Sequence, residues 1–285
     1  MIDLHMHSSY SDDGEYSPAE LVEKCFKAGI KIMSIADHNC ARANVEAEEA
    51  AKAKNICYIP GIEIDCTYQD IDFHVLGYGI NYKSSDFEEL ERNIEKQSFR
   101  ASMERLAQTQ ALGFHVTEND MRALSKDSYW KDIWTGEMFA EVLLSRSEYA
   151  DHPLLAPYRA GGCRGDNPYV NFYWDYYAQG KPCHAPMEYP EMREIIDMIH
   201  TNGGFAVLAH PWVNLKENIS LLDEILSLGL DGVEAFSSYH TKEQAEFLCA
   251  AAQRRHLLAT CGSDYHGKTK PAIGLGQHHC RLSYL

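Results

Sequence analysis

Short apolar segments alternate with segments that carry helix-start signals, and this alternation constrains the fold more than any other feature of the sequence. After the first apolar segment, Ser17 and Glu20 have the spacing of a capping box, Pro18 occupies the first helical position and Gly29 follows the helix. Seven segments are expected to be strands: 2–5, 30–36, 56–64, 73–80, 205–209, 232–236 and 257–261. Because strands that alternate with helices are typical of parallel βα units, the sequence predicts an α/β fold.

The alternation is interrupted between residues 85 and 189. A long polar helix is expected to begin at the capping-box spacing of Ser85 and Glu88 and to run to about Leu112, and a tract dense in aromatic and turn residues follows it. We interpret 85–189 as an inserted, mainly helical lid between the fourth and fifth strands, with 1–84 and 190–285 as the two parts of a barrel. A structural elaboration remote from any site is the alternative.

Composition narrows the possible partners and the compartment. With 26 basic and 42 acidic side chains the formal net charge is −16, so stable binding of duplex nucleic acid is not expected. No segment has the roughly 18 consecutive apolar residues of a membrane helix, and residues 1–14 do not resemble a signal peptide, which favours a cytoplasmic location. The nine cysteines are scattered without a C-x-x-C pair, which indicates reduced thiols rather than disulfides or a thiolate zinc site.

Histidines and carboxylates gather where the expected strands end, and the C-terminal strand ends of a parallel barrel form one face. They are His5, His7 and Asp12 after the first strand, Asp37 and His38 after the second, Glu63 at the third, His210 at the fifth, Glu234 near the end of the sixth, and Asp264 and His266 after the seventh. His-x-His in an extended segment places both imidazoles on one side, since strand side chains alternate. Imidazole with carboxylate suits Zn²⁺, Fe²⁺ or Mn²⁺. His74 opens its strand, and this pattern does not explain its place.

Five ordered motifs resemble those of the polymerase and histidinol phosphatase (PHP) family. They are D-x-H-x-H-S-x-x-S-D at 3–12, D-H at 37–38, G-I-E at 61–63, A-H-P at 209–211 and G-S-D-x-H-G at 262–267. The resemblance implies a distorted seven-stranded (β/α)7 barrel with up to three metal ions in its mouth and phosphoester hydrolysis as the reaction.

The same resemblance implies a ligand set for two to three divalent ions (Mn, Fe or Zn, with Mg as an alternative). It assigns His5, His7 and Asp264 to the first metal, Glu63 as the bridge to the second, His74 and His210 to the second, and Asp12, His38 and His266 to the third. Asp12-Asp13-Gly14 stands where the family has Asp-Gly; counting from His7 selects Asp12 and leaves Asp13 as the alternative.

A mechanism follows from this arrangement. A hydroxide that bridges two metals is a nucleophile at neutral pH, and the metals also neutralise charge on the phosphate. Two residues are candidates for supporting catalytic roles: His240 as a proton donor to the leaving group, with a structural role as its alternative, and Asp37, with Asp3, as an acceptor that orients an imidazole.

The lid departs from nucleotide-hydrolysing relatives, which often carry Arg-x-His-x-Ala at its start. Residues 134–141 read WTGEMFAE, without that arginine or histidine. Arg159, Arg164 and Lys181 are candidates to replace the missing phosphate contact. The lid aromatics are expected to form its own core, or alternatively to stack a base.

The sequence therefore predicts metal-dependent hydrolysis of a small phosphorylated molecule, most plausibly a nucleotide or nucleoside 3′,5′-bisphosphate. Histidinol-phosphate phosphatase, 5′–3′ exonuclease on short oligonucleotides and C–N amidohydrolase are the alternatives. Against the last, no lysine ends the fourth strand to bridge two metals. A noncatalytic regulatory module is disfavoured by the complete ligand set, and the oligomeric state does not follow from the sequence.

Overall fold

The structure is a computed structural model that describes residues 1–215 and 218–280. Its strands are β1 (Ile2–Asp3), β2 (Ile32–Met33), β3 (Cys57–Tyr58), β4 (Gly61–Tyr68), β5 (Ile71–Tyr78), β6 (Phe205–Leu208), β7 (Gly232–Ser237) and β8 (Leu258–Gly262). Its α-helices are α1 (Pro18–Lys27), α2 (Ala43–Ala53), α3 (Ser85–Ala111), α4 (Glu118–Leu124), α5 (Gly136–Ser145), α6 (Pro168–Tyr176), α7 (Met192–Thr201), α8 (Pro211–Leu215), α9 (Leu221–Ile225) and α10 (Lys242–Arg254). Three 3₁₀ turns cover Ser147–Tyr149, Ala156–Tyr158 and Gly267–Thr269.

The strands form two sheets rather than one closed barrel. One is a parallel sheet in the order β1-β2-β3, and the other has the order β4-β5-β6-β7-β8. Backbone hydrogen bonds connect the sheets at both edges: Leu4 donates to Cys261 O at 3.0 Å, and Asn39 donates to Glu63 O at 2.7 Å. The predicted α/β class is confirmed, whereas a closed seven-stranded barrel is not.

Two expectations about the strands are wrong. The predicted strand 56–64 is divided into β3 and β4 at Pro60, which has no N–H to continue a ladder. In addition, β5 runs antiparallel to both β4 and β6, while β6, β7 and β8 are parallel to one another. The two-residue turn between β4 and β5 has positive φ at Gln69 (51°) and Asp70 (61°), as a type I′ hairpin turn requires.

The antiparallel hairpin explains the position of His74. In its register, His74 near the start of β5 is paired with Asp65 towards the end of β4. The reversed strand therefore places His74 beside Asp65, which is two residues beyond Glu63. His74 joins the other polar side chains because its strand is reversed.

Helices cover the sheets and bury a large apolar core. In α7, Met192, Ile195, Ile196 and Ile199 have helical spacing and pack against buried residues of the five-stranded sheet such as Val75. The helices α1 and α2 cover the three-stranded sheet with a separate apolar cluster. No helix within residues 1–215 and 218–280 combines the length and the apolar character needed to cross a membrane.

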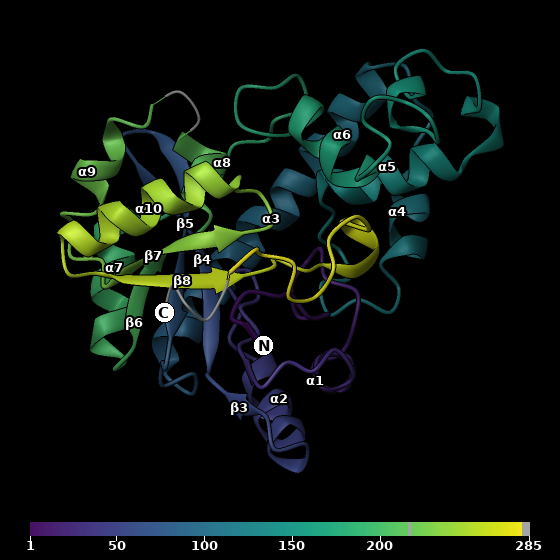
Figure 1. The fold of residues 1–285 in the computed structure, drawn as a ribbon. Coiled ribbons are helices and arrows are strands. Elements are labelled where there is room, and N and C mark those ends of the chain that lie inside the picture. Colours follow the sequence, from purple (N-terminus) through teal and green to yellow (C-terminus); the bar gives the residue numbers. More distant parts are fainter. Residues whose placement is uncertain (216–217, 281–285) are drawn as a thin grey trace.

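The inserted segment has its own core. Phe139, Phe172 and Trp134 are almost fully buried there, so most of its aromatic residues stabilise the lid itself. The helix α3 takes part in both cores, because Phe87 packs in the main core and Leu106 packs in the lid core. Figure 1 shows α3 extending from beside the five-stranded sheet into the group formed by α4, α5 and α6.

Candidate metal centre

The segment after β1 presents two buried imidazoles. His5 accepts a backbone hydrogen bond from Asp264 N at 2.8 Å, and His7 N donates to Tyr265 O at 2.9 Å, so residues 5–7 run beside the segment after β8. The alternation of extended backbone turns both imidazoles to the same side, where Asp264 Oδ1 lies 3.2 Å from His5 Nε2 and 3.0 Å from His7 Nε2. The ends of the first and last strands thus form one group.

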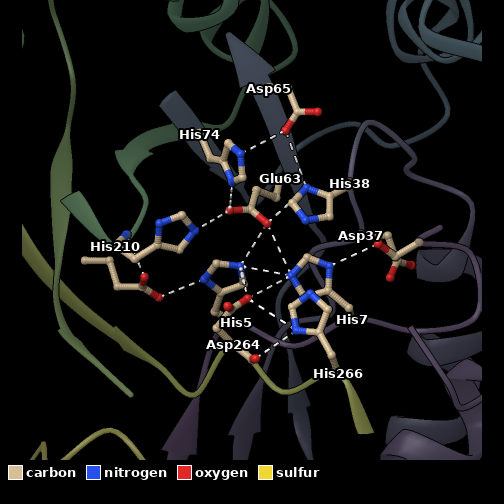
Figure 2. A network of polar contacts seen from close by, with 12 residues as sticks. His5, His7, Asp37, His38, Glu63, Asp65, His74, His210, Asp264 and His266 are labelled. Atoms are coloured by element: carbon tan, nitrogen blue, oxygen red, sulfur yellow. Dashed lines mark hydrogen bonds and ion pairs between the residues drawn. The ribbon is translucent and has the colours of Figure 1, made fainter. Parts of the chain in front are cut away.

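Glu63, which is fully buried on β4, lies between two groups of imidazoles. Its Oε2 atom is 3.1 Å from His5 Nε2 and 3.2 Å from His7 Nε2. Its Oε1 atom is 2.9 Å from His74 Nδ1 and 2.9 Å from His210 Nε2. Figure 2 shows Glu63 in the middle of the network, with His74 and His210 on one side of it and His5 and His7 on another.

A third group contains Asp13 where Asp12 is expected. The potential ligand atoms of His7, Asp13, His38 and His266 lie within 4.8 Å of one another, and Asp13 Oδ2 is 3.0 Å from His266 Nε2. Asp12 instead lines the adjacent cavity. The chain turns tightly just after Asp13, at Gly14, where an added Cβ would lie 1.9 Å from the carbonyl oxygen of residue 8.

Asp65 also belongs to the centre, although the sequence analysis did not select it. Its Oδ1 atom is 3.2 Å from His74 Nε2 and 3.5 Å from His38 Nδ1. Asp65 follows Glu63 by two residues, so both side chains lie on the same face of β4. The spacing E-x-D at residues 63–65 could have identified Asp65 as a further candidate ligand from the sequence.

The donor arrangement fits divalent cations. Glu63 Oε2 faces three imidazole nitrogens at once, those of His5, His7 and His38, at 3.1–3.3 Å. The Nε2 atoms of His5 and His7 are themselves only 3.2 Å apart. Neither His38 Nδ1 nor Glu63 Oε2 has a hydrogen-bond partner among the described residues, although both atoms are buried. Lone pairs converging in this way are satisfied together by a cation, and imidazole with carboxylate is a donor set for Zn²⁺, Fe²⁺ or Mn²⁺.

The electrostatics favour ionised carboxylates and a neutral His7. At His5 and His38, by contrast, burial lowers the pKa but Glu63 and other nearby carboxylates raise it well above the usual range, so metal binding would displace protons from these two rings. Burial raises the pKa of Glu63, but the imidazoles of His5 and His38 outweigh it and hold this pKa well below the usual range. Burial opposes ionisation of Asp264 as well, but Lys270 together with the imidazoles of His266 and His5 outweighs it and holds this pKa well below the usual range. Burial together with nearby imidazoles lowers the pKa of His7 to about 4. Ionised carboxylates and a neutral imidazole are the forms that bind metals.

Outer contacts fix the orientation of the ligands. Glu234 accepts from His5 Nδ1 at 3.0 Å and from His210 N at 2.9 Å, and both Tyr239 (2.7 Å) and Lys270 (2.6 Å) donate to Asp264 Oδ2. Such partners hold a ligand in one geometry. Lys270 and Tyr239 were missed in the sequence because they carry no recognisable spacing to the other motifs.

Asp37 and Asp3 act on backbone segments rather than on imidazoles. Asp37 accepts from Ser8 N at 2.5 Å and from Ser8 Oγ at 2.6 Å, and thereby ties the end of the second strand to the turn after His7. Asp3 accepts from Ser263 N at 2.8 Å and Ser263 Oγ at 2.7 Å. The structure gives Asp37 a positioning contact with no imidazole on its carboxylate.

His240 has a structural environment. Its Nδ1 atom donates to Ala235 O at 2.9 Å, and its Nε2 atom accepts from Trp212 N at 3.4 Å. With both ring nitrogens engaged and only 4% of the residue exposed, the expected role as proton donor to a leaving group does not fit this geometry. The histidine instead holds the start of α8, which follows His210.

A cavity of about 240 Å³ lies between the centre and the lid. Asp13, His38 and His74 line it from the barrel side, and Glu137 and Tyr173 line it from the lid. Its basic lining residues are Arg105 from α3 and Lys270.

The three predicted phosphate contacts lie elsewhere. Arg159 donates to the carbonyl oxygens of Leu144 (3.1 Å) and Tyr149 (2.8 Å), and Arg164 pairs with Asp175 at 2.9 Å. Lys181 is exposed, and none of the three is among the described residues that line the cavity. The two arginines bind polar groups of the lid itself, and these partners could not be inferred without the structure of its loops.

The packing around Gly136 leaves no room for a larger side chain such as the arginine of the family's lid motif. At Gly136 an added Cβ would lie 2.7 Å from Tyr177 Cγ and 2.8 Å from Tyr173 Cδ2. Two aromatic rings therefore occupy the space that a larger side chain at 136 would need. A basic contact for substrate has to come from another element.

Several known proteins are similar to this chain over most of its length. The family model described as PHP domain matches residues 3–201. A 5′-3′ exoribonuclease from Haemophilus influenzae is 27% identical (93% of this chain and 89% of the relative), and a 3′,5′-nucleoside bisphosphate phosphatase from Chromobacterium violaceum is 25% identical (93% and 87%). A phosphoribosyl 1,2-cyclic phosphate 1,2-diphosphodiesterase from Eggerthella lenta is 24% identical (93% and 94%).

Solved structures agree with this assignment. A protein from Bifidobacterium adolescentis described as a metal-dependent phosphoesterase has a TM-score of 0.78 and 28% identity, covering 99% of this chain and 93% of that chain. A C. violaceum protein described as an amidohydrolase, 22% identical with a TM-score of 0.78 (96% and 90% covered), has the same fold. The chain belongs to the PHP domain family of hydrolytic enzymes, as the motifs of its sequence imply.

Proposed function

We propose that the chain hydrolyses a phosphoester in a small phosphorylated molecule at a centre of two to three divalent metal ions, and that a nucleotide or nucleoside 3′,5′-bisphosphate is its favoured substrate. The observation that carries the proposal is Glu63, whose two carboxylate oxygens face two different groups of imidazoles. When bound, divalent ions in such a centre supply an activated water and neutralise charge on phosphate oxygens.

The proposed ligands divide into three sets that share Glu63 and neighbouring imidazoles. The first set is His5, His7, Glu63 and Asp264, the second is Glu63, His74 and His210, and the third is Asp13, His38 and His266 with His7. Asp65 lies beside the second and third sets through His74 and His38. Mn²⁺, Fe²⁺ and Zn²⁺ match these donors, and the carboxylates also accommodate Mg²⁺.

Arg105 is the proposed contact for an anionic group of the substrate. Lys270, the other basic residue on the cavity wall, is already paired with Asp264 at 2.6 Å. The Arg105 guanidinium donates only to neutral groups, Trp134 O at 3.1 Å and Met187 Sδ at 4.0 Å, and its buried Nε has no hydrogen-bond partner in the part of the chain that the structure describes. A cation held beside a cavity without a carboxylate partner is suited to a second phosphate.

The shape of the cavity favours a small substrate with a planar group. Tyr173 and Trp174 of α6 line the wall opposite the centre, and stacking of a base on such rings contributes about 1–3 kcal/mol. A volume of about 240 Å³ under a lid suits a single nucleotide better than a long strand. The bisphosphate phosphatase relative supports this choice, while the exoribonuclease relatives make the 5′ end of a short RNA the second candidate.

A phosphate-release panel with Mn²⁺ tests the proposal. It compares nucleoside monophosphates, nucleoside 3′,5′-bisphosphates, short oligoribonucleotides, sugar phosphates and histidinol phosphate, using the metal-stripped protein as a background control. The expected result is Mn²⁺-dependent release with the highest kcat/KM for a bisphosphate. Release from none of these esters would overturn the proposal, and a preference for oligonucleotides or for histidinol phosphate would overturn the assignment of the substrate.

A further inference from the structure

A second cluster of metal-binding side chains lies apart from the centre. The ligand atoms of Cys261, His278 and Cys280 all lie within 4.8 Å of one another. Cys261 and His278 are buried, with 2% and 4% of their surfaces exposed, and Cys280 is half-buried. The three come from β8 and from the segment after the last 3₁₀ turn, so no local C-x-x-C spacing announces them.

The cluster is on the other side of β8 from the carboxylate–imidazole centre. An added Cβ at Gly262 would lie 2.1 Å from His5 Cβ and 2.7 Å from Glu234 Oε1, so position 262 faces the centre. Because side chains alternate along a strand, Cys261 faces the opposite way, into the core shared with Leu248 of α10. The two sets of donors are therefore separate sites.

His278 is oriented as metal-bound histidines usually are. Its Nε2 atom donates to the carbonyl oxygen of Ile2 at 2.6 Å, which fixes the tautomer and leaves the lone pair on Nδ1. That lone pair accepts a hydrogen bond from Cys280 N at 3.2 Å, a contact that an ion bound by the three side chains would replace. The backbone carbonyl of Ile2 orients the ring, and the closeness of the imidazole to both thiols is what makes the group suitable for a metal ion.

We propose that Cys261, His278 and Cys280 form a thiolate–imidazole site for Zn²⁺ that fastens the C-terminal segment to the first and last strands. Sulfur and imidazole donors select Zn²⁺ over Mg²⁺ or Mn²⁺. The segment is held there by two further contacts, those of His278 with Ile2 and of Gly276 N with Asp3 Oδ2 at 2.7 Å. An ion at the site would add a crosslink between residues far apart in the chain.

Cobalt substitution tests the site without reference to catalysis. The metal-stripped, reduced full-length protein is titrated with Co²⁺, and the near-ultraviolet charge-transfer band of thiolate-bound Co²⁺ is recorded. None of the residues proposed for the phosphoesterase centre is a cysteine, so Co²⁺ bound there gives no such band. The expected result is a band whose intensity at saturation corresponds to one thiolate-bound Co²⁺ per chain and which excess Zn²⁺ abolishes.

The variants Cys280→Ser and Cys261→Ser are expected to lose the band, and Cys163→Ser, an exposed cysteine, is the matched control that keeps it. Circular dichroism confirms that each variant is folded. Because Cys280 is only half-buried, Cys280→Ser should disturb the core less than Cys261→Ser does. No band in the folded wild-type protein, or a band that persists in Cys280→Ser, would overturn the proposal. Failure of the phosphate-release panel would leave this result unaffected.

Discussion

Glu63 has a larger share in the centre than any other side chain, because each of its oxygens serves a different group of imidazoles. Eight of the nine ligands inferred from the sequence are brought together by the fold, and the ninth position is taken by Asp13 instead of Asp12. Counting back from Gly14 instead of forward from His7 would have selected Asp13. Spacing in the sequence finds residue types well but resolves adjacent carboxylates only when the turn between them is known.

Glu63→Gln should remove metal from two sets of ligands together. The amide keeps the size of the side chain but loses the charge that both sets use. We expect bound metal to fall by about two equivalents and turnover to fall by more than the roughly 10–100-fold that loss of an outer partner costs. Metal content measured by mass spectrometry and Mn²⁺-dependent phosphate release check this.

Two variants serve as references for that experiment. Glu234→Gln keeps an acceptor for His5 and should cost about 10–100-fold in metal affinity. Glu49→Gln, a substitution at an exposed position, should leave metal content and turnover unchanged. Unchanged metal content in Glu63→Gln would contradict the bridging role.

Arg105→Ala should lower kcat/KM selectively for a substrate with a second phosphate. Loss of a charge-assisted contact of about 1.5–3 kcal/mol corresponds to about tenfold to more than a hundredfold. Hydrolysis of p-nitrophenyl phosphate, which has no second anionic group, should change little. Arg92→Ala, an exposed position on the same helix, is the control. Equal losses on both substrates would show that Arg105 has no part in specificity.

At the scale of elements, the hairpin of β4 and β5 is the feature that sequence reasoning missed. Its turn, Gln69-Asp70, has the positive φ angles of a type I′ turn without the Asn-Gly or Asp-Gly sequence that usually signals one. The apolar runs on either side were therefore interpreted as parallel strands joined to helices. The helix starts were predicted more closely: the capping box at Ser17 is present, whereas the helix expected to begin with a capping box at Ser85 is capped by Ser84.

Asn44 joins α2 to the start of β4, and its removal should destabilise the fold. Its amide donates to Gly61 O at 2.8 Å, and its carbonyl oxygen accepts from Gly61 N at 2.9 Å and from Tyr58 OH at 2.8 Å. Asn44→Ala leaves these buried groups unpaired, and we expect the free energy of unfolding to fall by about 2–4 kcal/mol. Urea unfolding measures it, with the exposed Asn93→Ala as control; a loss within about 0.5 kcal/mol, as for a surface change, would refute this.

Glu137, in the first turn of α5, should make stability depend on pH. Burial, assisted by Asp13, raises the pKa of its carboxyl to about 7, above the ordinary value of 4.5. The folded chain therefore binds this proton more tightly than the unfolded chain, and stability falls as the pH rises from about 4.5 through 7. At pH 8 the cost is roughly 3 kcal/mol.

Glu137→Gln removes that cost because the amide stays neutral. Its Tm should exceed that of the wild-type protein at pH 8, and the difference should shrink towards pH 5. Thermal unfolding over this pH range checks the trend, with the exposed Glu89→Gln as a control. A Tm difference that does not vary with pH would show that the carboxyl of Glu137 is not responsible.

On the scale of the whole molecule, the lid is a second body with its own aromatic core that shares α3 with the main core. The sequence indicated the lid only through the interruption of the strand–helix alternation. Its contacts with the cavity could not be inferred, because Arg105 and Glu137 belong to elements whose packing depends on the complete lid. The candidate metal ligands, by contrast, could be found because most of them belong to short motifs next to expected strand ends; His74, on the reversed strand β5, is the exception.

The β4–β5 hairpin also bears on how the protein is made. Glu63, Asp65 and His74 lie on one hairpin. Its two strands are neighbours in the sequence, so it forms from contacts that are close in the chain. During synthesis from the N-terminus these three donors, together with His5 and His7, leave the ribosome well before His210 and Asp264. A chain that ends before His210 would thus carry these five donors but lack two of the residues that complete the proposed centre.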